Sequence, residues 1–164
     1  YLKEEFLNSD ALRNRAKRKQ GEIVHYLLSF VQNLNQEKID AVLKPAIENA
    51  KLVFPDEPDW KEYERIVQSI VNKAELKQFF YLTDEQVMNE CELIAANGQG
   101  KRIDRLIIGK SDITIVDYKL AKLKDSDYAK QVKEYMSIVK ELHPGKKVRG
   151  FIVYTNQLEC EEVG

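Results

Sequence analysis

The spacing of apolar positions changes about halfway along the chain, and this change predicts two structural regions. In the first half, apolar residues recur every three or four positions, which is the spacing of one face of an α-helix. In the second half, short apolar runs of strand character alternate with turn residues. We therefore expect an α/β protein in which a mainly helical part, residues 1–80, precedes a sheet part, residues 84–156.

The helical part contains three segments with a continuous apolar stripe. The first covers residues 21–34, the second residues 36–53 and the third residues 59–79. Pro45 lies inside the second stripe and has no N–H group to donate, so we expect a break there, with Pro45 opening a new helix. The prolines and acids of residues 54–59 predict a loop.

The sheet part predicts four strands and one helix. Strands are expected over residues 86–95, 102–108, 113–119 and 148–154, and a helix over residues 126–142. A strand–helix–strand unit with a right-handed crossover makes its two strands parallel neighbours. The expected architecture is therefore a central mixed sheet flanked by helices, with antiparallel hairpins plus one parallel β-α-β unit.

The loop at residues 109–112 sets the register of one hairpin. The resulting pairs are Ile108 with Ile113, Leu106 with Ile115, and Asp104 with Asp117. Like charges that face each other across a strand pair are destabilising, and Lys119 falls on the same face because side chains alternate along a strand. A divalent cation between the carboxylates would relieve the repulsion. The alternative is that Asp104, Asp117 and Lys119 are ordinary surface residues near strand ends.

Composition bounds the class of protein. The 164 residues are 43% hydrophobic and 32% charged with a net charge of −1, which suits one domain whose affinity for nucleic acid, if any, comes from local patches. Cys91 and Cys160 are too few for a disulfide framework, so we expect a reducing compartment, the cytoplasm. No apolar run approaches the roughly 20 residues of a membrane span. Because the chain starts at Tyr1 without methionine, we expect a piece of a longer polypeptide.

Two short motifs carry a resemblance to a known family. Ile103-Asp104-Arg105, followed by Asp117-Tyr118-Lys119, resembles the bipartite D…(D/E)xK motif of the PD-(D/E)xK nuclease superfamily. The form of the motif resembles the RecB-type nuclease domain, which lies at the C-terminal end of helicase–nucleases similar to the exonuclease V beta subunit. Residues 21–25 resemble the Gly-x-x-x-His segment of that domain, and residues 131–135 resemble its Q-x-x-x-Y element. Lys101, where relatives have glycine, and Leu120, where they have Thr or Ser, depart from the pattern.

The resemblance implies a restriction-endonuclease-like core and a set of functional residues. It implies Mg²⁺, with Mn²⁺ as a substitute, held by His25, Asp104, Asp117 and the backbone carbonyl of Tyr118. It also implies that Lys119 acts on the reacting phosphate or water, while Gln131 and Tyr135 hold the DNA strand. Glu90 is expected in a supporting role. Some relatives hold an iron–sulfur cluster through four cysteines, so we expect no such cluster in a chain with two.

Basic residues cluster just before the first predicted helix. The cluster contains Arg13, Arg15, Lys17, Arg18 and Lys19. One interpretation is contact with the phosphate backbone of DNA, with Lys146, Lys147 and Arg149 as a second contact region. The other is a solvated helix face. For His25, likewise, a purely structural role is the alternative to metal binding.

The resemblance implies a metal-dependent DNA nuclease domain that hydrolyses phosphodiester bonds in recombinational repair, at the processing of double-strand break ends. Its expected partners are DNA and a helicase portion of the same polypeptide or complex, since the chain lacks a GxxxxGK[ST] phosphate loop of its own. The alternative is a catalytically inactive nuclease-like domain that binds DNA or docks a partner. A third possibility is an unrelated α/β domain with chance matches.

Overall fold

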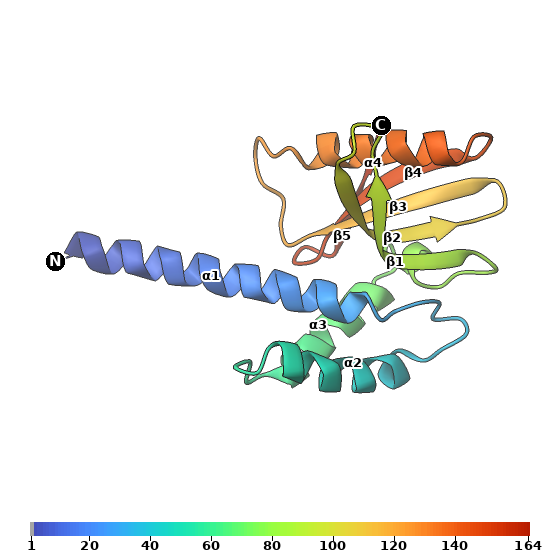
Figure 1. Ribbon diagram of the computed structural model, residues 1–164. Coiled ribbons are helices and arrows are strands. Elements are labelled where there is room, and N and C mark those ends of the chain that lie inside the picture. The colour runs from blue at the N-terminus through green and yellow to red at the C-terminus, as the bar shows by residue number, and fades with distance from the viewer. Residues whose placement is uncertain (1) are drawn as a thin grey trace.

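The computed structural model describes residues 2–164, with side chains from Ala11 onward. Its helices are α1 (Leu2–Leu28), α2 (Ile39–Val53), α3 (Trp60–Asn72), the short 3₁₀ helix η1 (Lys77–Phe79) and α4 (Tyr128–Leu142). Its strands are β1 (Gln86–Ile94), β2 (Gly100–Ile108), β3 (Asp112–Lys119), β4 (Lys147–Tyr154) and β5 (Glu159–Val163). Helices α1 to α3 lie on one side of the sheet and α4 lies on the other (Figure 1).

The five strands form one mixed sheet in the order β1-β2-β3-β4-β5. Strands β3 and β4 are parallel, whereas the other neighbouring pairs are antiparallel. The predicted α/β class, the hairpins and the β-α-β unit are therefore confirmed. Strand β5 was not predicted, because its sequence Glu-Cys-Glu-Glu-Val is rich in acids and it forms the exposed edge of the sheet beside β4.

The predicted hairpin register holds up to the point where the acids begin. Ile108 faces Ile113 and Leu106 faces Ile115, as expected, but the ladder ends at Arg105 and Val116. The expected backbone pairing of Asp104 with Asp117 is therefore wrong. Instead, the Asp104 carboxylate accepts the N–H of Tyr118 at 2.8 Å, so a side chain binds this backbone group where a ladder partner would.

The helical part differs from the prediction at its boundaries. Helix α1 begins far earlier than Gly21, includes the basic cluster, and ends at Leu28. The third predicted helix ends at Asn72 and is followed by turns and η1. Within residues 2–164, no helix combines the length and the apolar character that crossing a membrane requires.

The break expected at Pro45 does not occur, since α2 continues through it. Pro45 and Ala41, whose carbonyl the missing N–H would have bonded, both lie on the exposed face, where water can bind that carbonyl. The opposite face buries Val42, Ala46 and Ala50, and this packing holds the helix together.

Each face of the sheet has its own apolar core. Val116, Tyr118 and Phe151 face the helical part and join its core. Ile113 and Ile115 face α4 and pack against it. Because side chains alternate along a strand, Asp117 and Lys119 continue the α4 face of β3 beyond Ile115.

Candidate functional site

Two buried carboxylates lie at the end of the central strand pair. Asp117 is only 3% exposed and stands near the carboxyl end of β3, the middle strand of the sheet. The backbone there is fixed from β4, because the Lys119 carbonyl accepts the N–H of Thr155 at 2.8 Å and the Leu120 carbonyl accepts the N–H of Asn156 at 2.9 Å. Asp104 enters from the neighbouring strand β2. The carboxyl end of an interior parallel strand is where α/β sheets bind ligands.

His25 comes from the last turn of α1, far away in sequence, and its side chain faces these acids. Its Nδ1 atom lies 3.8 Å from Oδ1 of Asp104. The imidazole contacts the Tyr118 ring edge to face, with ring centroids 5.6 Å apart, and one third of its side chain is exposed. One helix and two strands thus bring His25, Asp104 and Asp117 together.

The site favours neutral forms of these groups when no cation is bound. The pKa of Asp104 and that of Asp117 are each raised to about 6, mainly by burial, and for Asp117 the charge of Asp104 is the second cause. Burial also lowers the pKa of His25, although Asp117 and Glu90 oppose this effect. Near neutral pH the imidazole is therefore in the unprotonated form that binds metals.

Lys119 lies on the α4 side of the carboxylates. Its Nζ atom lies 3.1 Å from Oδ2 of Asp117 and donates a hydrogen bond to Oε1 of Gln131 at 3.0 Å. Tyr135, one helical turn after Gln131, is 5% exposed and packs against the sheet. Burial, followed by the charges of Asp117 and Asp104, raises the pKa of the Tyr135 hydroxyl to about 12. Gln131 thus contacts Lys119 directly, while Tyr135 lies behind it in the core.

The residue types at this site fit a divalent cation, although the side chains lie too far apart to bind one ion together. Among the described residues, no group of three or more His, Cys, Asp or Glu side chains is close enough to hold a metal ion as it stands. However, Oδ2 of Asp117 is buried and, among the described residues, it has only the ion pair with Nζ of Lys119 at 3.1 Å and no hydrogen bond of good geometry. A buried carboxylate oxygen without a hydrogen bond is costly, and carboxylates with a neutral imidazole suit a hard or borderline cation.

Glu90 is a third acid at this place. In the antiparallel register of β1 and β2 it falls opposite Asp104, between the pairs Asn89–Arg105 and Cys91–Ile103, yet it forms no ladder pair itself. Its backbone has φ +52°, a left-handed conformation that costs free energy for a residue other than glycine. Its Oε2 atom forms an ion pair with Nε of Arg102 at 2.8 Å.

Arg105 holds together the segments that form the site, a role that no motif in the sequence indicated. It is fully buried and donates to the carbonyls of Phe79, Val31 and Gln32 at 2.9, 2.6 and 2.6 Å. These bonds tie the segment after α1, and with it His25, to the strand that carries Asp104. The available signal was a charged residue within a strand whose neighbouring residues, Ile103 and Leu106 to Ile108, are apolar.

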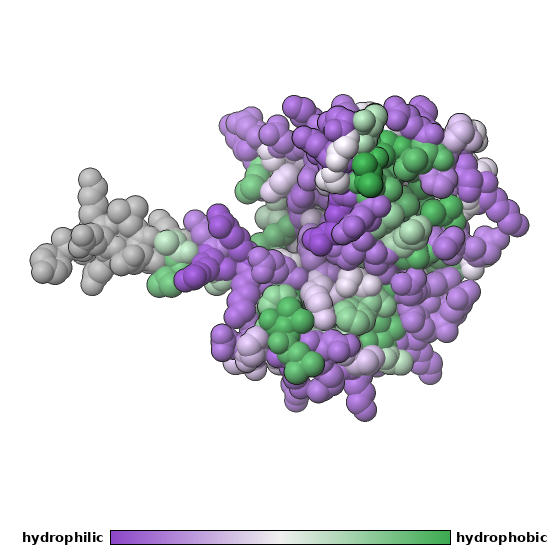
Figure 2. All heavy atoms as spheres, in the orientation of Figure 1, coloured by the Kyte–Doolittle hydropathy of each residue, from purple (hydrophilic) through white to green (hydrophobic). Residues whose placement is uncertain are grey.

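The basic cluster lies on α1, where the helix extends away from the body of the molecule (Figure 1). Arg13, Arg15, Lys17 and Arg18 are exposed, and Lys19 lies 4.0 Å from Glu57. Figure 2 shows this part of α1 as a hydrophilic surface. Arg18 precedes His25 by about 10 Å along the helix axis.

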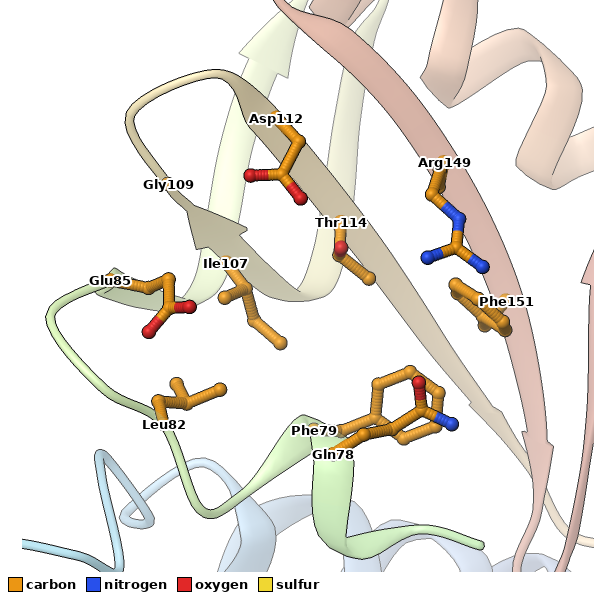
Figure 3. A pocket seen from close by; sticks show the side chains of 10 residues that line it. All are labelled: Gln78, Phe79, Leu82, Glu85, Ile107, Gly109, Asp112, Thr114, Arg149 and Phe151. Carbon is orange, nitrogen blue, oxygen red and sulfur yellow. The ribbon is translucent and has the colours of Figure 1, made fainter.

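The second basic group, expected to contact DNA, lies at the opposite end of the sheet from the carboxylates. Lys146 donates to the Gly109 carbonyl, and Arg149 pairs with Glu162. A small cavity of about 140 Å³ lies at this end, lined by residues that include Glu85, Asp112 and Arg149 (Figure 3). This end of the sheet is therefore separate from the candidate site.

Two larger hollows adjoin the site itself. Lys119 and Gln131 line one of about 670 Å³, and His25 and Glu90 line another of about 550 Å³. They share no lining residue. The functional side chains are therefore accessible from the α4 side and from the α1 side.

Comparison with known families places nearly the whole chain in a described family. The sequence profile of the PD-(D/E)XK nuclease superfamily matches residues 2–162, which is nearly the whole chain. A comparison with curated proteins finds no match.

Proposed function

This chain belongs to the PD-(D/E)XK nuclease superfamily, and from that premise we propose that it is a metal-dependent DNA nuclease domain that hydrolyses phosphodiester bonds. The observation that carries the proposal is the meeting of His25, Asp104, Asp117 and Lys119 at one end of the sheet. Three different elements supply them. A protein that needed only stability would gain nothing from burying two carboxylates whose pKa values are both raised to about 6.

His25, Asp104, Asp117 and the Tyr118 carbonyl would hold the ion, which we take to be Mg²⁺ with Mn²⁺ as a substitute, because Mg²⁺ prefers oxygen ligands. When bound, such an ion activates a water molecule and polarises the phosphate. Ligand carboxylates must be deprotonated to bind a metal. Because the pKa of Asp104 and that of Asp117 are both raised to about 6, protons compete with the metal increasingly as the pH falls through this value.

The chain's own groups then act on the substrate. Lys119, held by Gln131, presents a positive charge beside Asp117, where it stabilises the charge that develops on the phosphate. Gln131 and Tyr135 orient the DNA strand. Tyr135 is buried, so its effect is indirect, through its packing between α4 and the sheet. Arg13, Arg15, Lys17, Arg18 and Lys19 contact the phosphate backbone along α1.

Within the superfamily we propose a RecB-type domain that takes part in recombinational repair by processing double-strand break ends, next to a helicase portion and in the cytoplasm. The closeness of His25 to Asp104, and of Gln131 to Lys119, supports this proposal because these residues belong to the Gly-x-x-x-His and Q-x-x-x-Y elements. The alternative is an inactive DNA-binding or docking module. The ion pair of Lys119 with Asp117 favours that alternative, since it occupies one prospective ligand.

The test is DNA cleavage in the presence of Mg²⁺ by the chain and its variants. Asp117→Asn and Lys119→Met should each lower the cleavage rate by about 100-fold or more, because each removes a group that acts on the transition state. Asp112→Asn is the matched control, because Asp112 is exposed and lies at the opposite end of β3 from Asp117. This variant should cleave DNA at the unaltered rate. Full activity of Asp117→Asn would refute the assignment.

Calorimetric titration with Mn²⁺ separates the active domain from the inactive one. The active domain should bind Mn²⁺ at a site that is lost in both Asp104→Asn and Asp117→Asn. A chain that binds DNA but shows no such site is the inactive module.

A further inference from the structure

The hollow beside His25 has an apolar wall that the proposed reaction does not use. Tyr26, Val53 and Phe54 form this wall, and the rings of Tyr26 and Phe54 meet edge to face with centroids 5.7 Å apart. Val53 is 54% exposed, and the adjacent Leu52 is 81% exposed. An apolar patch covers this end of α2 in Figure 2. Exposed apolar side chains gathered at a hollow indicate a contact surface.

The other side of the same hollow is charged. Arg102 and Glu90 line it, and they form the ion pair described above. The Arg102 side chain is 66% exposed, so this pair is weak and is readily exchanged for another. A guanidinium binds a phosphate through two parallel hydrogen bonds at least as well as it binds a carboxylate.

Arg102 is also well placed relative to the candidate metal ligands. It precedes Asp104 by two residues on β2, and it lines the same hollow as His25, whose Nδ1 atom lies 3.8 Å from Oδ1 of Asp104. Its positive charge is felt at the Asp104 carboxyl, whose pKa it lowers in part. A phosphate bound by Arg102 would therefore lie next to the one at the carboxylates.

We propose that Arg102 and the wall formed by Val53 and Phe54 bind one unpaired nucleotide beside the scissile phosphate. Arg102 exchanges Glu90 for the phosphate of this nucleotide, and the base lies against the apolar wall. In a duplex the base faces are stacked on one another, so only an unpaired base offers its face to such a wall. This subsite rests on the proposed action on DNA, and it makes strands with an unpaired end the preferred substrate.

The phosphate half is tested by binding of a fluorescein-labelled single-stranded oligothymidine, measured by anisotropy in EDTA. Arg102→Gln should weaken binding about tenfold, since it removes a charge-assisted, two-point contact. Arg102→Lys, which keeps the charge without the fork, should recover part of the loss. Arg65→Gln is the matched control, because Arg65 is 72% exposed and paired with Glu62 on α3, and it should bind as the unaltered chain does.

Substitution of Glu90 tests whether Arg102 contacts the phosphate directly or only supports the local structure. Glu90→Gln alone should strengthen binding in EDTA, because it frees Arg102, and it should have little effect when combined with Arg102→Gln. Additive effects of the two substitutions would show that they do not act through their pair. Unaltered binding by Arg102→Gln would overturn the subsite.

The base half is tested with Val53→Ser and an abasic strand of the same length. Val53→Ser should weaken binding of the oligothymidine about threefold and leave the abasic strand unaffected, because contact with a base is what it removes. Leu142→Ser, at an exposed position on the last turn of α4, should bind both strands as the unaltered chain does. Equal losses on both strands, or a blunt hairpin duplex that competes as well as the single strand, would overturn the base contact.

These measurements separate failure of the subsite from failure of the nuclease proposal, because they use neither metal nor cleavage. If the Arg102 and Val53 variants weaken binding as expected but the chain does not cleave DNA, the subsite is supported and the nuclease proposal is refuted. If the chain cleaves DNA but Arg102→Gln binds the oligothymidine as tightly as the unaltered chain, the nuclease proposal is supported and the subsite is refuted.

Discussion

Arg105 carries a positive charge into the interior and satisfies it mainly with backbone carbonyls. Its guanidinium contacts the Phe80 ring at 5.0 Å and also donates to Oδ1 of Asn89. Because its carbonyl partners lie in the segments after α1 and after α3, one side chain sets the position of the helical part relative to β2. Burial lowers the pKa of the Arg105 guanidinium, and Tyr118 and Glu37 oppose this effect.

Replacing Arg105 should destabilise the protein more than replacing an exposed arginine. We expect Arg105→Ala to lower the free energy of unfolding by about 3 kcal/mol or more, because several buried carbonyls lose their donor. Urea unfolding monitored by circular dichroism measures this. Arg149→Ala, which breaks an exposed pair with Glu162, should cost less than about 1 kcal/mol. Equal costs for the two variants would contradict the role assigned to Arg105.

At the scale of elements, two helices reach the sheet by different means. Helix α1 touches the site only through its last turns, and the rest of it extends outward with Gly21 in its interior. Helix α4 lies directly on β4 across Gly150. A Cβ atom added at Gly150 would lie 2.6 Å from Cγ1 of Val132 and 2.7 Å from Sδ of Met136. Close contact between α4 and the sheet therefore depends on the missing side chain at that position.

The same substitution at these two glycines should have opposite effects. Gly21→Ala should raise the free energy of unfolding by up to about 1 kcal/mol, because alanine favours the helix and the added Cβ meets no atom within 4 Å. Gly150→Ala should lower it by about 1–3 kcal/mol through overpacking against α4. Thermal and urea unfolding of both variants test the pair. Stabilisation by Gly150→Ala would show that α4 can move away from the sheet without loss.

At the scale of the whole molecule, charge is unevenly distributed. The net charge is −1, yet α1 presents a run of exposed basic side chains close to the His25 end of the site. A nearly neutral protein gains affinity for DNA only through such a local patch, because each phosphate contact releases counterions. The extension of α1 from the body leaves these side chains free to follow a strand toward the carboxylates (Figure 1).

This distribution predicts how DNA affinity responds to salt. Replacing Arg15 and Arg18 together by Gln should reduce the slope of log affinity against log salt by about 1–2 on single-stranded DNA, since each phosphate contact contributes about 0.7. Anisotropy titrations over a range of salt concentrations measure the slope. Replacing Lys110 and Lys147, at the far end of the sheet, should leave it unchanged. Equal changes in the two double variants would mean that only total charge matters.

Local sequence determined much of the architecture. Apolar alternation gave β1 to β4 and the helix of the β-α-β unit nearly to their observed ends, because a strand or helix with one buried face needs that spacing whatever its partners are. Turn chemistry at residues 109–112 fixed the pairing of Ile108 with Ile113. The continuation of α2 through Pro45 could not be predicted from local sequence, because it depends on which face of that helix is exposed to water.

The tertiary structure alone decided what the buried polar groups do. The sequence indicated His25, Asp104, Asp117 and Lys119 as candidates through their motifs, but their mutual distances depend on how α1 packs against β2. The role of Arg105 and the pairing of Arg102 with Glu90 also come from contacts between segments that no local pattern relates. The physical reason is that periodicity reports which face of an element is buried, whereas the charge, hydrogen bonding and pKa of a polar group depend on partners that arrive from other elements.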